Sequence, residues 1–194
     1  YVRISGAAKH SWEQGAGMYL DNSDPIIRHV SIINNDGVVN GGGGMALIQS
    51  DPIMTYVMIS DNVCDQCEGS GMALNQSSPT MTYVTISNHG GIHGSGMTMA
   101  QSSPIMNNVT IVNNTAAGIG GAIYSWNAQP TLINCTISGN TAGSNNGGIV
   151  SDGGSSIEII NSIVWGNTPL SSTYATITYS DIEGGSDGEG NINT

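Results

Sequence analysis

Four residues with metal-binding or redox chemistry occur in one part of the chain. Cys64 and Cys67 are separated by two residues, and His89 and His93 follow in the next loop of the same kind. In an exported protein such a cysteine pair most often closes as a local disulfide. The pair could instead remain as free thiols, or join the two histidines in a tetrahedral zinc site. The third cysteine, Cys135, falls at an apolar position, so we expect it to be buried.

Two aspartates occupy equivalent positions in neighbouring stretches. Asp24 and Asp51 each come one residue before a proline. If the two stretches stack as adjacent strands, the carboxylates lie about 5 Å apart, which suits a retaining glycosidase pair or half of a calcium site. The alternative is that each Asp-Pro step only initiates and solvates a turn.

Two tyrosines also repeat at one position. Tyr56 and Tyr83 each follow a proline by four residues, and His29 occupies the same position one stretch earlier. We expect these rings to stack on one outer face, where they could bind a sugar or form a packing ladder between strands. Together with Asp24 and Asp51 they make a candidate ligand face.

The acidic segment near the end of the sequence is a candidate calcium site. Asp187, Glu189 and Asn191 stand two residues apart among glycines. Oxygen ligands at alternate positions of a flexible loop can hold calcium, so calcium is a candidate cofactor. No bidentate acid follows at a suitable distance, and a solvated acidic turn is the alternative.

A repeat of about 26 residues positions all of these groups. Its starts are Pro25, Pro52, Pro79, Pro104 and Pro130, with Ile157 in the sixth position, at spacings of 27, 27, 25, 26 and 27 residues. Apolar residues two, five and seven positions after each start predict strands with one buried face. Apolar residues seven and five positions before each start predict a second short strand, and in the sixth repeat these positions hold Val150 and Asp152.

Two further columns are set by single residue types. Glycine stands ten residues before every start, at Gly15, Gly42, Gly69, Gly94, Gly120 and Gly147. Such a glycine indicates a positive φ or a close approach between coils. Ten residues after each start stand Asn35, Asn62, His89, Asn114, Asn140 and Asn167. Stacked asparagine amides can hydrogen-bond along a column, and asparagine also tolerates the left-handed conformation of a sharp corner.

The repeat resembles a known fold family. Residues 121–124 followed by 130–140 are similar to right-handed parallel β-helix repeats, the fold of pectate-lyase-like proteins and of polymorphic outer-membrane-protein surface repeats. The resemblance covers nearly the whole chain and implies an all-β right-handed parallel β-helix, or β-solenoid, of about seven coils with 25–27 residues each. It implies little about function, because this fold hosts enzymes, adhesins and inert stalks.

The enzymes of this resemblance have requirements that the chain does not match. Lyases of the class use a basic residue with calcium bound by acids, and only Arg3, Lys9 and Arg28 are basic here. Hydrolases of the class use three aspartates with a histidine and an Arg-x-Lys motif, which is absent. We therefore assign no catalytic residue and lean against an enzyme.

One outer column is a candidate contact surface. The position directly after each start holds Ile26, Ile53, Thr80, Ile105 and Thr131, a semi-apolar stripe if it faces outward. Exposed apolar stripes often mark protein contacts, although a turn could also rotate these residues inward. A separate threonine column suggests ice binding less strongly, because Met58 and Ile163 interrupt it.

Composition limits the partners of this chain. Three Lys and Arg against 14 Asp and Glu give a net charge of −11, which disfavours nucleic acid and anionic membrane surfaces. No apolar run reaches the length of a membrane span. Low charge with many small polar residues is typical of proteins outside the cell, so we expect an extracellular or cell-surface location. The expected partners are other copies, surface proteins or polysaccharide.

The whole of 1–194 is expected to form one β-helix domain. Coils are expected to start near residues 1, 15, 42, 69, 94, 120 and 147, with a short final coil and acidic tail in 170–194. Both ends would then be open sheet edges, as in part of a longer chain or an assembly subunit. The expected function is an extracellular structural or adhesive element, namely a stalk, filament or surface-layer subunit or adhesin fragment. The alternative is a carbohydrate-binding or polysaccharide-cleaving module.

Overall fold

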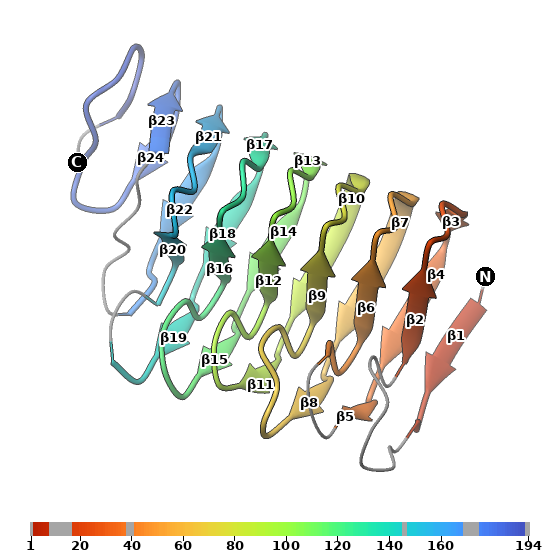
Figure 1. Ribbon diagram of the computed structural model, residues 1–194. Helices are drawn as coiled ribbons and strands as arrows, with labels where there is room; N and C mark the ends of the chain where they lie inside the picture. Colours follow the sequence, from red (N-terminus) through yellow and green to blue (C-terminus); the bar gives the residue numbers. More distant parts are fainter. Residues whose placement is uncertain (1, 8–16, 38–40, 145–146, 169–174, 193–194) are drawn as a thin grey trace.

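The described part of the chain is a parallel β-helix. The computed structural model describes residues 2–7, 17–37, 41–144, 147–168 and 175–192. Within these ranges the chain contains no helix, and successive coils stack side by side with all strands parallel (Figure 1). Six strands of one sheet mark about six complete turns, close to the seven that were expected. No described residue belongs to a helix with the length and apolar character needed to cross a bilayer.

Three parallel sheets run along the stack, and we name them A, B and C. Sheet A carries the strands that follow each repeat start: β1 (Val2–Ser5), β3 (Ile26–Arg28), β4 (Val30–Ile33), β7 (Ile53–Ser60), β10 (Thr80–Ser87), β13 (Ile105–Asn107), β14 (Thr110–Val112), β17 (Thr131–Ile133), β18 (Thr136–Ser138), β21 (Ile157–Ile160), β22 (Ile163–Trp165), β23 (Ala175–Thr178) and β24 (Asp181–Ile182). Sheet B is made of two-residue strands: β5 (Asp36–Gly37), β8 (Val63–Cys64), β11 (Gly90–Gly91), β15 (Thr115–Ala116) and β19 (Thr141–Ala142). Sheet C carries the strands that precede each start: β2 (Met18–Asp21), β6 (Met45–Ile48), β9 (Met72–Asn75), β12 (Met97–Ala100), β16 (Ile123–Trp126) and β20 (Ile149–Asp152).

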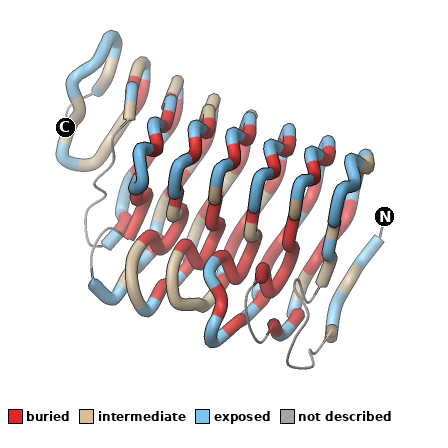
Figure 2. The backbone as a smooth tube through the Cα atoms, in the orientation of Figure 1, coloured by how far each residue is buried: buried red, intermediate tan, exposed pale blue. Residues whose placement is uncertain are grey.

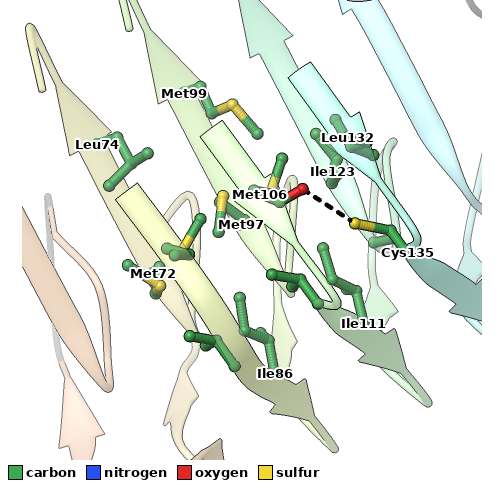
Figure 3. Packing of buried hydrophobic residues seen from close by; sticks show 14 of the residues in the cluster. Met72, Leu74, Ile86, Met97, Met99, Met106, Ile111, Ile123, Leu132 and Cys135 are labelled. Carbon is green, nitrogen blue, oxygen red and sulfur yellow. Dashed lines mark hydrogen bonds between the residues drawn. The ribbon is translucent and has the colours of Figure 1, made fainter. Parts of the chain in front are cut away.

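The core is a continuous column of aligned apolar side chains inside the coils. Along strands such as β9, β16 and β21, buried residues alternate with more exposed ones, as the period of two predicts (Figure 2). In β4, β6 and β12 three consecutive residues are buried. Met97, Met106 and Ile111 are at most 1% exposed and pack together in the centre (Figure 3). Cys135 lies in the same core, as expected, and its Sγ donates to the Met106 carbonyl at 3.5 Å. Burial raises the pKa of this thiol, so Cys135 remains protonated and unreactive.

Each coil bends at three places, and a residue with positive φ stands at each bend. The three columns are Asn22, Gln49, Gln76, Gln101 and Asn127; His29, Tyr56, Tyr83, Asn108, Asn134, Asn161 and Tyr179; and Asn34, Asp61, Asn88, Asn113, Gly139 and Gly166. The expectation that the stacked asparagines themselves adopt the left-handed conformation is wrong. The residue before each of them does so, because the chain must reverse before the next side chain can point inward.

The glycine column serves both expected purposes. Gly69, Gly94 and Gly120 have positive φ, whereas a Cβ on Gly42 would stand 1.9 Å from the Met45 carbonyl oxygen of its own coil. Gly147 is equally crowded, since a Cβ there would lie 2.2 Å from the Thr168 carbonyl oxygen. Gly15 lies outside the described residues.

The sixth repeat departs from the predicted register by one residue. Ile149, not Val150, pairs with Ile123 and is fully buried, while Val150 and Asp152 pair with the outward residues Tyr124 and Trp126. The physical reason is a turn at Gly153 and Gly154, both with positive φ, which adds one residue before the next strand.

The tail beyond β24 folds back on the last coil and forms hydrogen bonds with part of its edge. The Tyr179 N–H donates to the Glu189 carbonyl at 2.8 Å, and the Ile192 N–H donates to the Ser180 carbonyl at 2.9 Å. Asn191 donates through Nδ2 to the Ile177 carbonyl at 3.0 Å. The tail therefore supplies some of the hydrogen bonds that another coil would otherwise make.

Candidate functional site

A groove of about 470 Å³ lies on the outer face of sheet C. Its floor is a column of small side chains on β6, β9 and β12, namely Ala46, Ala73 and Thr98. The next strand in the stack, β16, places Tyr124 in this column and Trp126 in the neighbouring one. The groove therefore extends over three coils and ends against two aromatic side chains.

The loops before the strands complete the groove. Gly41, before β6, and Glu68, before β9, both line it. The Gly69 N–H donates to the His93 carbonyl at 2.9 Å, which ties the loop that carries Glu68 to the next coil. Trp126 is held on its far side by Gly153, where a Cβ would lie 2.4 Å from its Nε1. Because glycine leaves this space free, the indole lies against the backbone of the following coil while 47% of the residue remains exposed.

Tyr124 connects the aromatic wall to the acidic residues around it. Partial burial, followed by the negative charges of Asp152 and Glu68 and a hydrogen bond to the Asp152 side chain, raises its pKa above the ordinary value of 10.0. The His93 ring lies 6.0 Å from the Tyr124 ring at a tilt of 42°. Tyr124 is therefore a neutral hydroxyl at physiological pH, able to exchange hydrogen bonds with a ligand.

The chemistry of this lining suits binding. Glu68 is the only charged residue among the described groove residues, and none of them is Lys or Arg. Arg3 and Arg28 lie on strands of sheet A, and Lys9 lies outside the described residues. The groove thus offers an aromatic wall and polar groups but no strong base for proton abstraction from a uronate.

The cysteine pair closes as a disulfide between Cys64 and Cys67, with their Cα atoms 5.3 Å apart. The zinc alternative is wrong, because both sulfur atoms are bonded to each other and the histidines have other partners. His93 Nδ1 accepts a hydrogen bond from the Ile119 N–H at 3.2 Å, and the His89 ring lies among buried backbone groups. No three His, Cys, Asp or Glu of the described residues gather closely enough to hold a metal ion.

The asparagine column forms the predicted ladder. Asn35 and Asn114 each donate through Nδ2 to the Oδ1 of the next asparagine, Asn62 and Asn140, at 2.9 Å. Asn140 donates in the same way to Asn167 at 2.9 Å. Each Oδ1 also accepts the backbone N–H of the coil before it, so these buried amides are fully used.

His89 replaces an asparagine in the middle of this ladder. Its Nε2 lies 3.1 Å from the Ile59 carbonyl, where an asparagine would place Nδ2, and its Nδ1 accepts the Asn62 N–H at 3.1 Å. These two bonds require the neutral tautomer with a proton on Nε2. Desolvation by burial lowers the pKa of His89 below 6.5, against smaller opposing effects of its backbone bonds and of Asp61.

A second polar ladder was not predicted. The hydroxyls of Ser50, Ser77 and Ser102, two residues before each start, accept the backbone N–H of the preceding coil at 3.0 to 3.1 Å. Ser155 accepts the Ala128 N–H at 3.0 Å in the same way. The signal in the sequence was the serine that recurs at this position in five of the six repeats, at Ser23, Ser50, Ser77, Ser102 and Ser155.

Asp24 and Asp51 accept backbone hydrogen bonds in the turn before each proline. Asp24 Oδ1 accepts the Asp51 N–H at 2.7 Å, and Asp51 Oδ1 accepts the Ser78 N–H. Ser78 Oγ continues the series by accepting the Ser103 N–H at 2.9 Å. Both carboxylates are therefore backbone acceptors along a turn, which accounts for them without a ligand.

The aromatic column forms the expected stack. The rings of His29 and Tyr56 lie 5.1 Å apart, as do those of Tyr56 and Tyr83, and both pairs are within 7° of parallel. The stack stands on sheet A, away from the groove of sheet C, and half of each tyrosine is exposed. Its use as a ligand face stays a prediction.

The acidic tail residues have partners of their own. Glu189 Oε1 accepts the Tyr179 hydroxyl, and Asn191 Oδ1 accepts the Ser180 N–H at 3.0 Å. Asp187 is exposed. Because two of the three side chains already hold the tail in place, their contacts favour a structural role, and calcium binding there stays a prediction.

The stripe after each repeat start faces outward. Ile26 is 63% exposed, and Ile53 and Ile105 are each 46% exposed. Thr80 and Thr131 stand in register between and after them on neighbouring strands. The alternative that a turn rotates these residues inward is therefore wrong.

Sequence analysis missed the groove because the residues in its main column differ in size from coil to coil. Trp126 has no aromatic counterpart in the other described coils and Tyr124 has one only in Tyr19. Ala46, Ala73 and Thr98 form no recognisable sequence pattern. The available signal was the change from small to large residues down one outward column of the strands before each start.

Three parallel sheets, internal polar ladders and a stacked apolar core define a β-solenoid of the parallel β-helix class. The family model described as right handed beta helix region matches residues 2–164, so the chain belongs to this family. The fold and its handedness therefore agree with the resemblance inferred from the repeats. No curated protein matches the chain with significance.

Proposed function

We propose that the protein is an extracellular adhesive β-solenoid that binds a polysaccharide in the groove of sheet C. The observation that carries the proposal is the aromatic wall of Tyr124 and Trp126 beside a floor of small side chains. Aromatic side chains with one polar end pack against the apolar face of a sugar ring while hydrogen-bonding its hydroxyls. A straight groove across stacked strands suits an extended, repeating ligand.

The charge of the groove favours a neutral or amino sugar over a uronate. Glu68 lines the groove, Asp152 hydrogen-bonds to Tyr124, and the whole chain carries a net charge of −11. These charges repel an anionic polysaccharide, and no described groove residue is a Lys or Arg that would offset them. The same charge disfavours nucleic acid as a partner.

An extracellular location agrees with two features of the molecule. The Cys64–Cys67 disulfide persists in an oxidising compartment, and charged residues make up only 9% of the chain. Stacked coils with buried ladders make a stiff element that presents the groove at a fixed orientation, which is the structural part of this proposal.

A glycan array with the wild-type protein tests the proposal, run with and without calcium. We expect binding to a neutral or amino-sugar polymer, and about tenfold weaker affinity for Trp126→Ala, because one stacked aromatic contributes about 1.4 kcal/mol. Trp165→Ala is the matched control, since Trp165 is also an exposed tryptophan but lies on sheet A.

Two results would overturn the proposal. One is the absence of any glycan binding by the wild-type protein. The other is an equal loss of affinity in Trp126→Ala and Trp165→Ala, which would move the binding site away from the groove.

A further inference from the structure

Sheet A carries an outward surface, built from aligned columns of side chains, that lies apart from the proposed groove. We define the Ile/Thr face as two outward columns on β3, β7, β10, β13, β17 and β21. The first column holds Ile26, Ile53, Thr80, Ile105, Thr131 and Glu158, and the second holds Arg28, Thr55, Thr82, Asn107, Ile133 and Ile160. Most of the exposed large apolar side chains of the described residues lie on sheet A, including Ile26, Ile53 and Ile105.

The charges on this face are balanced and sit at opposite ends. Arg28 is its only cation and Glu158 its only anion, so the face sums to zero (+1 − 1) in a chain of net charge −11. Two copies of so acidic a chain repel each other least where each presents no net charge. Because the two charges are separated by five strand steps, two copies lying in opposite directions bring each Arg28 near Glu158 of the other copy.

The side-chain sizes beside the face also favour two copies that lie in opposite directions. The bend beside the face carries the large rings of Tyr56 and Tyr83 in its first half and the small side chains of Asn108 and Asn134 in its second half. In opposite orientation, tyrosines meet asparagines. In the same orientation, tyrosines meet tyrosines and hold the sheets apart.

The columns of the face match under the same reversal. A twofold axis that runs along the strands, between β10 and β13, sets Ile53 against Thr131, Thr80 against Ile105, and Thr55 against Ile133 of the second copy. Every branched apolar residue in the centre then packs against a threonine. Arg28 lies one outward position, about 6.6 Å along the strand, from Glu158 of the second copy, within reach of its side chain.

We propose that the protein forms an antiparallel twofold homodimer through the Ile/Thr face of sheet A. This interface is independent of the proposed glycan groove, which lies on sheet C and stays open in the dimer. The face is narrow, so we expect association in the micromolar range and not an obligate dimer.

Light scattering over about 1 to 300 µM protein gives the first test. We expect the mass to rise with concentration from 19.9 kDa, the mass of one chain, toward about 40 kDa, which is twice that value. A mass that stays at one chain over this whole range overturns the proposal.

Charge exchange tests the pairing between copies. We expect Arg28→Glu alone, or Glu158→Arg alone, to weaken dimerisation at least tenfold, and the double variant R28E/E158R to restore it to within about threefold of wild type. Circular dichroism confirms that each exposed substitution leaves the fold intact. A double variant no stronger than either single variant overturns the proposed pairing.

Crosslinking of mixed single-cysteine variants, Ile53→Cys and Thr131→Cys, tests the orientation. In the proposed dimer, the thiol introduced by I53C on one copy faces the thiol introduced by T131C on the other at the sheet-packing distance of about 10 Å, whereas two copies of the same variant place their introduced thiols about 17 Å apart. A short bismaleimide should therefore crosslink an equimolar mixture of I53C and T131C but neither variant alone. Cys64 and Cys67 are bonded to each other and Cys135 is buried, so they do not react. Efficient crosslinking of I53C alone overturns the antiparallel arrangement.

Discussion

Single buried polar residues hold neighbouring coils together in this protein. Each asparagine of the ladder satisfies an amide of the coil before it and a carbonyl inside the core. Only Ser125 Oγ and Asp181 Oδ1 are buried without a hydrogen-bond partner among the described residues. A ladder side chain is therefore hard to replace, since losing one leaves several buried groups unpaired.

His89 makes one position of this ladder sensitive to pH. Because burial lowers its pKa below 6.5, the folded state binds fewer protons than the unfolded state below that pH. The stability contributed by neutral His89 is complete above pH 6.5 and is lost as the pH falls toward the lowered folded pKa. For His89→Asn we expect this loss to disappear, a difference of up to about 1.4 kcal/mol at pH 5.5.

Urea unfolding of wild type and His89→Asn at pH 7.5 and pH 5.5 measures this difference. His29→Asn is the matched control, because His29 is exposed and asparagine already occupies its column at Asn108 and Asn134. If His89→Asn loses as much stability between the two pH values as wild type does, the assignment to His89 is wrong.

At the scale of the element, the bends decide where most strands end. In most coils of sheet A one residue with positive φ separates two strands, whereas Tyr56 and Tyr83 bend the longer strands β7 and β10 without ending them. Sheets C and A are joined through another residue with positive φ. Asparagine, glutamine, aspartate and even tyrosine take these positions, although glycine tolerates them best. The strand length is therefore set by bends that cost little only for suitable residue types.

A β-branched residue at a bend should reveal the free-energy cost of a positive φ. Asn127 stands between β16 and β17 with φ of 49°. We expect Asn127→Val to lower the free energy of unfolding by about 1–2 kcal/mol, because branched side chains clash with the backbone in the left-handed region. Asn127→Gly should be neutral or slightly stabilising.

Thermal or urea unfolding of both variants provides the measurement. Gln129→Val serves as the control, because Gln129 is exposed on the same turn and has no positive φ. Equal destabilisation by Asn127→Val and Gln129→Val would show that the backbone conformation is not the cause.

At the scale of the whole molecule, each coil is stabilised by its contacts with the adjacent coils. A stacked solenoid is held by contacts between adjacent coils, so it opens from its ends. The tail of residues 186–192 covers one end through Asn191, which bonds to both Ile177 and Ser180. The tail thus protects β23 and β24 in the way that a further coil would.

Removing the amide of Asn191 should loosen this end alone. For Asn191→Ala we expect hydrogen exchange of the β23 and β24 amides to become about tenfold faster, because losing these bonds costs about 1.4 kcal/mol locally. Exchange in β12 and β14, several coils away, should stay unchanged. Exchange measured by mass spectrometry tests this, with exposed Asp187→Ala as the control, and a uniform increase along the whole chain would contradict local protection.

Much of the element-level organisation followed from the sequence. The period of about 26 residues, the alternation around Ile86 and Ile111 and the column containing Asn114 are local patterns, and stacking of equal units turns them into a fold directly. For the same reason the outward stripe at Ile53 and the stack of Tyr56 on Tyr83 were predictable, since both need only equal positions in adjacent coils.

Only the tertiary structure decided the features that do not repeat at equivalent positions of the coils. The groove depends on unequal residues in one column, from Ala46 to Tyr124, and on a loop that brings Glu68 beside them. The shifted register of the sixth repeat depends on one added residue at Gly153–Gly154, and the covered end depends on a tail without the repeat. A repeating pattern specifies what each coil shares with its neighbours. The groove arises where the coils differ, and its residues come together only when the chain is folded.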